Sequence, residues 1–235
     1  MAEQIVSPGV FTRENDQSFI TQQPVEVGGA LVGPTVLGPV EIPTIVTSYS
    51  EYQNKFGSTF VSGGRVYSHL TAISAYNYFQ NGGNTLLVTR VVTGSFTPAT
   101  ASIQGASNPA LKLKTISEGT IMNSESTLGA DGDLPNGTSD NVRWEVSFSD
   151  TGSGTFNLLI RQGNDLTNDK VVLETYAGVS LDPFQDNYIA KVIGDSSQKL
   201  LSDSDGNKYL QVTGSYPNKS NYVYVDEVLL PTPNF

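Results

Sequence analysis

Few residues in this sequence have side chains and spacings that could support chemistry. The single histidine, His69, could serve as a general base, because imidazole changes charge near neutral pH. It stands at the start of a helical pattern, and the triplet Gly152–Gly154 lacks the Gly-x-Ser-x-Gly pattern of a nucleophile elbow. A Ser-His-Asp triad is assembled by the fold, so sequence alone leaves it open. We predict a structural histidine, a turn at Gly152–Gly154 and no enzymatic activity.

The glycine-rich segment Gly28–Pro34 has the composition of a phosphate-binding loop. It lacks the Lys-Ser/Thr pair that contacts phosphates, and proline follows where a helix N-terminus would be needed. A buried strand in which glycines allow close backbone approach explains the segment better. We therefore expect no nucleotide and no cofactor.

Two acidic clusters, Asp131–Asp133 and Asp203–Asn207, contain oxygen ligands suited to calcium. Counted from Asp203, the twelfth position of a calcium loop is Gly214, where a bidentate glutamate would be required. The sequence also has no cysteine, which excludes thiolate metal sites and disulfides. We predict solvated acidic turns and no bound metal.

Aromatic residues follow alternating segments in the second half of the chain. They could line a sugar-binding face, or they could pack across strands in a core. The first reading makes the chain a β-rich carbohydrate-binding or adhesin module of a virion, and we keep it as the alternative function. The residues concerned are Trp144, Tyr176, Tyr188, Tyr209, Tyr222 and Tyr224.

The charge balance argues against nucleic acid as a partner. Thirteen basic and 23 acidic residues give a formal charge of -10 and a pI near 4.4. The N-terminus lacks the basic and apolar regions of a signal peptide, and no run of about 18 apolar residues occurs. We expect neither secretion by that route nor insertion into a membrane.

Hydrophobic periodicity predicts a small α/β unit in residues 23–95. Apolar residues recur at helical spacing from Leu70 to Phe79, and Asn81-Gly82 can end that helix. A buried strand follows at 85–92. Before them we predict a strand around 25–33, an edge strand near Pro43 and a short helix that ends at Gly57.

A β-rich part is predicted for residues 96–200. Residues 142–148 and 155–161 both alternate and are joined by a Gly-Ser-Gly turn, so we expect a hairpin. Further strands are predicted at 110–116 and 171–176, and residues 187–193 form a short helix or a strand. Residues 201–235 would add β segments of an incomplete domain that continues beyond the chain end. The fold class is therefore mixed α+β, with a mainly antiparallel outer part.

Several motifs resemble contractile phage tail sheath proteins. Ser7-Pro8-Gly9-Val10-Phe11 is similar to the family's N-terminal opening, and the Gly-Pro turns at Gly33 and Gly38 precede a proline-bearing strand in the family's order. The run from Tyr78 through Asn81-Gly82-Gly83 to Arg90 resembles its helix-to-strand signature. Together the motifs cover residues 5–95 well and 110–195 loosely.

The resemblance implies a structural subunit that forms hexameric rings, stacks helically around a tail tube and contracts to drive the tube through a host envelope. It implies partners of several kinds, namely further copies, the tube protein, baseplate and tail terminator proteins, and a place in the virion after assembly in the host cytoplasm. Residues 1–22 would be an extended arm that adds a strand to a neighbouring subunit. The arm contacts would be made by Val6, Ser7, Pro8, Gly9, Val10 and Phe11.

Overall fold

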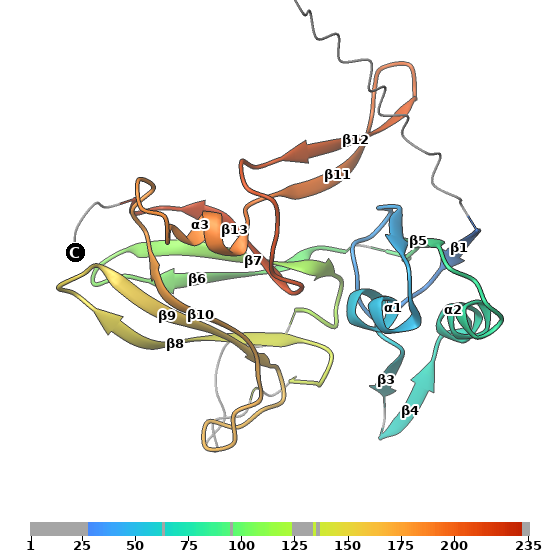
Figure 1. Ribbon diagram of the computed structural model, residues 1–235, viewed down its shortest axis with the longest axis horizontal. Coiled ribbons are helices and arrows are strands. Elements are labelled where there is room, and N and C mark those ends of the chain that lie inside the picture. The colour runs from blue at the N-terminus through green and yellow to red at the C-terminus, as the bar shows by residue number, and fades with distance from the viewer. Residues whose placement is uncertain (1–27, 63, 95, 124–133, 135–136, 232–235) are drawn as a thin grey trace, which may run out of the picture.

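The computed structural model describes residues 28–62, 64–94, 96–123, 134 and 137–231, and these form a mixed α+β protein with mainly antiparallel sheets (Figure 1). The predicted fold class is thus confirmed. The proposed arm, with Val6 to Phe11, lies outside the described residues. The boundaries predicted between parts of the chain, at residues 22, 95 and 200, stay predictions.

The α/β part contains a three-stranded sheet in the order β1-β5-β2, with β1 parallel and β2 antiparallel to β5. Its core combines strand residues such as Val46 and Val88 with Tyr52, Phe56 and Ala75 from the helices. Figure 1 shows the two helices beside one another on one side of this sheet. The elements are β1 (Gly29–Gly33), β2 (Thr44–Val46), α1 (Tyr49–Phe56), α2 (Leu70–Gln80) and β5 (Leu86–Arg90).

Local signals fix the ends of α1. The side chain of Ser48 accepts a hydrogen bond from the backbone N–H of Glu51 at 3.1 Å, and the Glu51 carboxylate accepts one from Thr47 N at 2.8 Å. At the other end Gly57 adopts a φ of 69°, which favours glycine. The predicted short helix and its glycine stop are confirmed, as is the longer helix α2.

The β-rich part packs two three-stranded antiparallel sheets face to face, in the orders β13-β7-β6 and β10-β9-β8. Leu111, Leu113 and Val225 of the first sheet meet Leu158 and Ile160 of the second in one core. The predicted hairpin is β8–β9, and residues 187–193 contain the short helix α3. The elements are β6 (Pro98–Gln104), β7 (Pro109–Glu118), β8 (Val142–Asp150), β9 (Thr155–Gln162), β10 (Val172–Ser180), α3 (Ile189–Ile193) and β13 (Val223–Val228).

Two further hairpins form separate two-stranded sheets, and they project in opposite directions in Figure 1. One consists of β3 (Thr59–Ser62) and β4 (Arg65–Ser68). The other consists of β11 (Ser197–Ser202) and β12 (Lys208–Thr213). The first hairpin, β6 and β11 were not predicted from the sequence.

Candidate assembly surfaces and the joint between the two parts

His69, the residue considered for catalysis, packs beside an aromatic ring at the start of a helix. His69 is the N-cap residue of α2, and its ring stacks on Phe60 with 5.0 Å between centroids. Burial, and then the positive charge of Arg90, lower the pKa of His69. In the described ranges, no group of three or more His, Cys, Asp or Glu residues could hold a metal ion.

The acidic segment at 203–207 forms a turn. The carboxylate of Asp203 accepts hydrogen bonds from the backbone N–H groups of Asp205 at 2.9 Å and Asn207 at 2.8 Å, and from the side-chain amide of Asn207 at 3.0 Å. The side-chain bond from Asn207 is the main reason why the pKa of Asp203 is lowered. The carboxylate thus shapes the loop between β11 and β12, while Asp131–Asp133 lie outside the described residues.

The glycine-rich segment at 28–34 is a strand in close contact with α2. A β-carbon at Gly33 would lie 2.6 Å from the Thr71 hydroxyl, and one at Gly29 would lie 3.1 Å from the Tyr78 ring. No helix begins directly after Pro34, since α1 starts at Tyr49. These glycines therefore permit tight packing between strand and helix, as predicted from the sequence.

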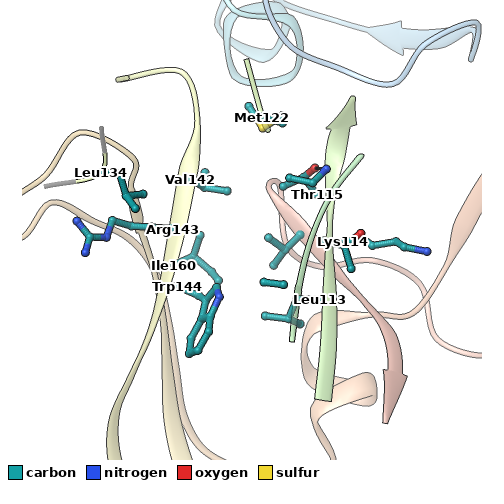
Figure 2. A pocket seen from close by; sticks show the side chains of 13 residues that line it. Leu113, Lys114, Thr115, Met122, Leu134, Val142, Arg143, Trp144 and Ile160 are labelled. Atoms are coloured by element: carbon teal, nitrogen blue, oxygen red, sulfur yellow. Dashed lines mark hydrogen bonds between the residues drawn. The ribbon is translucent and has the colours of Figure 1, made fainter. Parts of the chain in front are cut away.

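The aromatic residues of the β-rich part do not gather on one face. Tyr176, Tyr188 and Tyr222 pack against the core, Tyr224 lies on β13 between the core residues Val223 and Val225, and Tyr209 lies on the separate β11–β12 hairpin. Trp144 lies on β8, beside a mainly apolar cleft of about 290 Å³ between the two sheets (Figure 2). This dispersal gives the carbohydrate-binding alternative no observation in its favour.

One face of the α/β sheet exposes large apolar side chains. Leu86 and Val88 of β5 point into the core beneath the helices, whereas residues on the other face alternate with them along each strand. On that other face Val32 of β1 is 68% exposed and Ile45 of β2 is 45% exposed. Exposed apolar side chains of this size are typical of a surface that binds another chain.

The opposite side of the same part carries a second apolar surface. Helix α2 contains no charged residue, and its exposed side carries the large apolar side chains of Leu70, Ile73 and Tyr76 beside the polar residues Ser74, Asn77 and Gln80. Thr71, Ala72 and Ala75 are buried against the sheet, while Leu70 is 79% exposed and Ile73 is 46% exposed. Exposed large apolar side chains that lie close together on a helix are typical of a surface that binds another chain.

The free edge of the sheet is a third feature suited to assembly. Strand β1 pairs only with β5, so one of its edges has no strand partner in the described chain. The strand Gly29–Gly33 contains no charged residue and no proline, which are the usual protections of an edge. It therefore has the backbone groups and the composition to accept an added strand.

A buried arginine joins the two parts. Arg90, the last residue of β5, is 5% exposed, and its Nη1 donates hydrogen bonds to the carbonyl oxygens of Gly38 at 2.6 Å and Glu118 at 2.8 Å. Its Nε has no partner in the described chain. Gly38 precedes the edge strand β2, and Glu118 ends β7, so one guanidinium contacts both parts.

Glu118 completes this joint. Its carboxylate accepts a hydrogen bond from Val40 N at 3.3 Å, and the neighbouring Ser117 hydroxyl accepts one from Gly38 N at 2.8 Å. Burial raises the pKa of Glu118, an effect that the Val40 bond and the Arg90 charge oppose. Burial also lowers the pKa of Arg90. Each of these two charged groups thus loses solvation at the joint.

Comparison with known proteins finds similarity among solved structures. No family model matches the chain, and no curated protein matches it. Among solved structures, the chain is similar to the sheath tail protein from Desulfitobacterium hafniense, with 12% identity and a TM-score of 0.32. The match covers 92% of this chain and 38% of that protein, so the chain spans about two fifths of its length.

The site residues from the sequence analysis and those from the structure differ. The predicted contacts at Val6–Phe11 lie outside the described residues and stay predictions. The exposed face of α2 was missed, although the absence of any charged residue from the helix was a signal in the sequence. The Arg90 joint was also missed, and its partners lie 52 and 28 residues away in sequence.

Proposed function

We propose that this chain is a structural subunit that assembles with copies of itself, as part of a contractile tail sheath around a tail tube. The observation that carries the proposal is the α/β part, which exposes apolar side chains on both of its sides. Val32 and Ile45 are exposed on the sheet face, and Leu70 and Ile73 on the helix face. Large exposed apolar surfaces on opposite sides favour contacts with more than one neighbour.

The free edge of β1 supports a role for the N-terminal segment. An extended arm that adds a strand to a neighbouring subunit gains backbone hydrogen bonds without a large preformed interface. The segment resembles the sheath family's opening at Ser7–Phe11, and its apolar residues Val6, Val10 and Phe11 could occupy pockets on the neighbour. On this proposal the arm links subunits within a lattice.

The remaining parts of the proposal follow from the resemblance of sequence motifs. They are hexameric rings, helical stacking, contraction, the virion as location, and tube, baseplate and terminator proteins as partners.

Among the described helices, none has the length and apolar composition of a membrane span. The role proposed is mechanical, and it requires that the two parts keep a defined orientation, which the Arg90 joint favours.

Sedimentation velocity over a concentration series tests the proposal. The full chain should form large species as its concentration rises, and a variant lacking residues 1–22 should stay monomeric to much higher concentration. Circular dichroism of both proteins controls for folding. A full chain that stays monomeric throughout would contradict self-assembly.

A further inference from the structure

The sheet of the α/β part carries its two helices on one face and exposes apolar side chains on the other (Figure 1). The register of the strands places Ala30, Leu87 and Ile45 in one row across this second face, and Val32 beside Thr89. Val32 and Ile45 are the large side chains exposed there. Sheets built around parallel strands, as β1 and β5 are, generally carry helices on both faces. A further helix is therefore the natural cover.

The exposed sheet face has the dimensions of one helix. Strands β1 and β5 have five residues each, so they are about 17 Å long, and three strands span about 10 Å. Helix α2 has 11 residues and is therefore about 16 Å long, and a helix with its side chains is about 10–12 Å wide. One helix of the length of α2 thus fits along these strands.

Helix α2 presents an outward side that suits this face. Thr71, Ala72 and Ala75 are buried against the sheet of the same chain, so Leu70 and Ile73 lie on the side turned away from it. The polar residues on that outward side carry no charge, and they are Ser74, Asn77 and Gln80. A sheet face can accept such a side without burying an unpaired charge.

Both surfaces lack charge, although the chain as a whole is acidic. The net charge of -10 means that two copies repel over most of their surfaces. Residues 66–89, which include α2, contain no Asp, Glu, Lys or Arg, and neither do β1 and β2. Two copies therefore meet with least repulsion where these surfaces face each other. An uncharged surface gives no electrostatic preference for a basic partner, which favours a second copy as the occupant.

We infer that the sheet face of one copy is covered by the outward side of α2 of the next copy. This inference rests on the proposed self-assembly and names one of its contacts. Because the two surfaces differ and lie on opposite sides of one sheet, the contact is heterologous. Each end of the assembly keeps one free surface, so repetition of the contact extends it subunit by subunit.

Cross-linking between introduced cysteines tests the contact, because the chain has no cysteine of its own. Leu87→Cys lies at the middle of the sheet face, since β5 is the central strand, and Ile73→Cys lies on the outward side of α2. The two variants are mixed at a concentration at which the chain assembles and are treated with a short bismaleimide. Mixed dimers should exceed those of either variant alone by about fivefold or more, because bound neighbours hold the two thiols at high effective concentration.

Two further variants serve as controls. Asp186→Cys, at an exposed position on the β-rich part, takes the place of Leu87→Cys in the mixture and should give no excess of mixed dimers. Ile45→Cys, at a more exposed position on the same sheet face, should cross-link to Ile73→Cys even if the half-buried Leu87 is needed for folding. Circular dichroism verifies the fold of each variant.

The outcomes separate this contact from the proposed function. An unaltered chain that assembles, with no excess of mixed dimers for either sheet position, would overturn the contact and leave self-assembly standing. Efficient dimers of Ile73→Cys alone would show α2 against α2 and would also overturn it. Failure of the unaltered chain to assemble would overturn both the contact and the proposed function.

Discussion

The Arg90 guanidinium donates a 2.8 Å hydrogen bond to the carbonyl oxygen of Glu118, and this bond links the last residue of β5 to the last residue of β7. The same Nη1 reaches Gly38 O at 2.6 Å. Three segments that are distant in sequence therefore meet at one buried cation. Such a joint favours a defined orientation of the α/β part relative to the β-rich part.

Replacement of Arg90 by methionine should weaken the folded state. The change leaves two buried carbonyl oxygens without their donor and Glu118 without its positive neighbour, so we expect a loss of about 3 kcal/mol in the free energy of unfolding. Urea denaturation measures this loss. Arg65→Met, at an exposed position, is the control and should stay within about 0.5 kcal/mol. Equal urea midpoints for both variants would refute the role given to Arg90.

Glu118→Gln should alter the pH dependence of stability. Burial raises the pKa of Glu118 above its ordinary value of 4.5, so the folded state holds this proton more tightly than the unfolded state does. The contribution of Glu118 is therefore present below the unfolded pKa and is lost as pH rises through the folded pKa. Between about pH 4 and pH 7, the unaltered chain should lose stability relative to Glu118→Gln. If the urea midpoints of both proteins change in parallel across that pH range, Glu118 does not contribute to stability in this way.

The β-rich part depends on a buried ion network around Asp165. Arg161 donates to its carboxylate from Nε at 2.7 Å and from Nη2 at 2.9 Å, and Val171 N donates at 2.9 Å. Asp165→Ala should cost about 3 kcal/mol, because it leaves a buried guanidinium without its main partner. Glu145→Gln removes a more exposed partner of Arg161 and should cost about 1 kcal/mol or less. Thermal unfolding in which Glu145→Gln is less stable than Asp165→Ala would contradict this interpretation of the network.

The exposed face of α2 should matter for assembly and not for folding. Leu70→Glu and Ile73→Glu place charges where a neighbouring subunit would bury apolar surface. The free energy of unfolding of the isolated chain should stay within about 0.5 kcal/mol of its original value, while assembly is lost or greatly reduced. Light scattering, measured over a series of protein concentrations, reports the loss of assembly. Assembly at the original concentration would show that α2 faces solvent in the assembled state.

The sequence predicts elements whose pattern is regular over enough residues. The helical spacing from Leu70 to Phe79, the glycine stop at Gly57 and the alternating runs that became β8–β9 are all confirmed. Each of these signals is local, because it depends on neighbours within a few residues. The fold class followed from them.

The elements that were missed have weaker or non-local signals. β6 begins in a stretch of small polar residues on a sheet edge, where little apolar pattern is required. The β3–β4 hairpin did have a signal, since Gly63-Gly64 separates two β-capable runs. The contact of Arg90 with Gly38 and Glu118 had no signal in the sequence, because these residues meet only through tertiary packing.

Negative-stain electron microscopy of the purified chain at high concentration tests self-assembly through the N-terminal arm most directly. The full chain should form rings or striated tubes, and the variant lacking residues 1–22 should remain as small separate particles. Small separate particles from both proteins, with folding verified by circular dichroism, would contradict the claim.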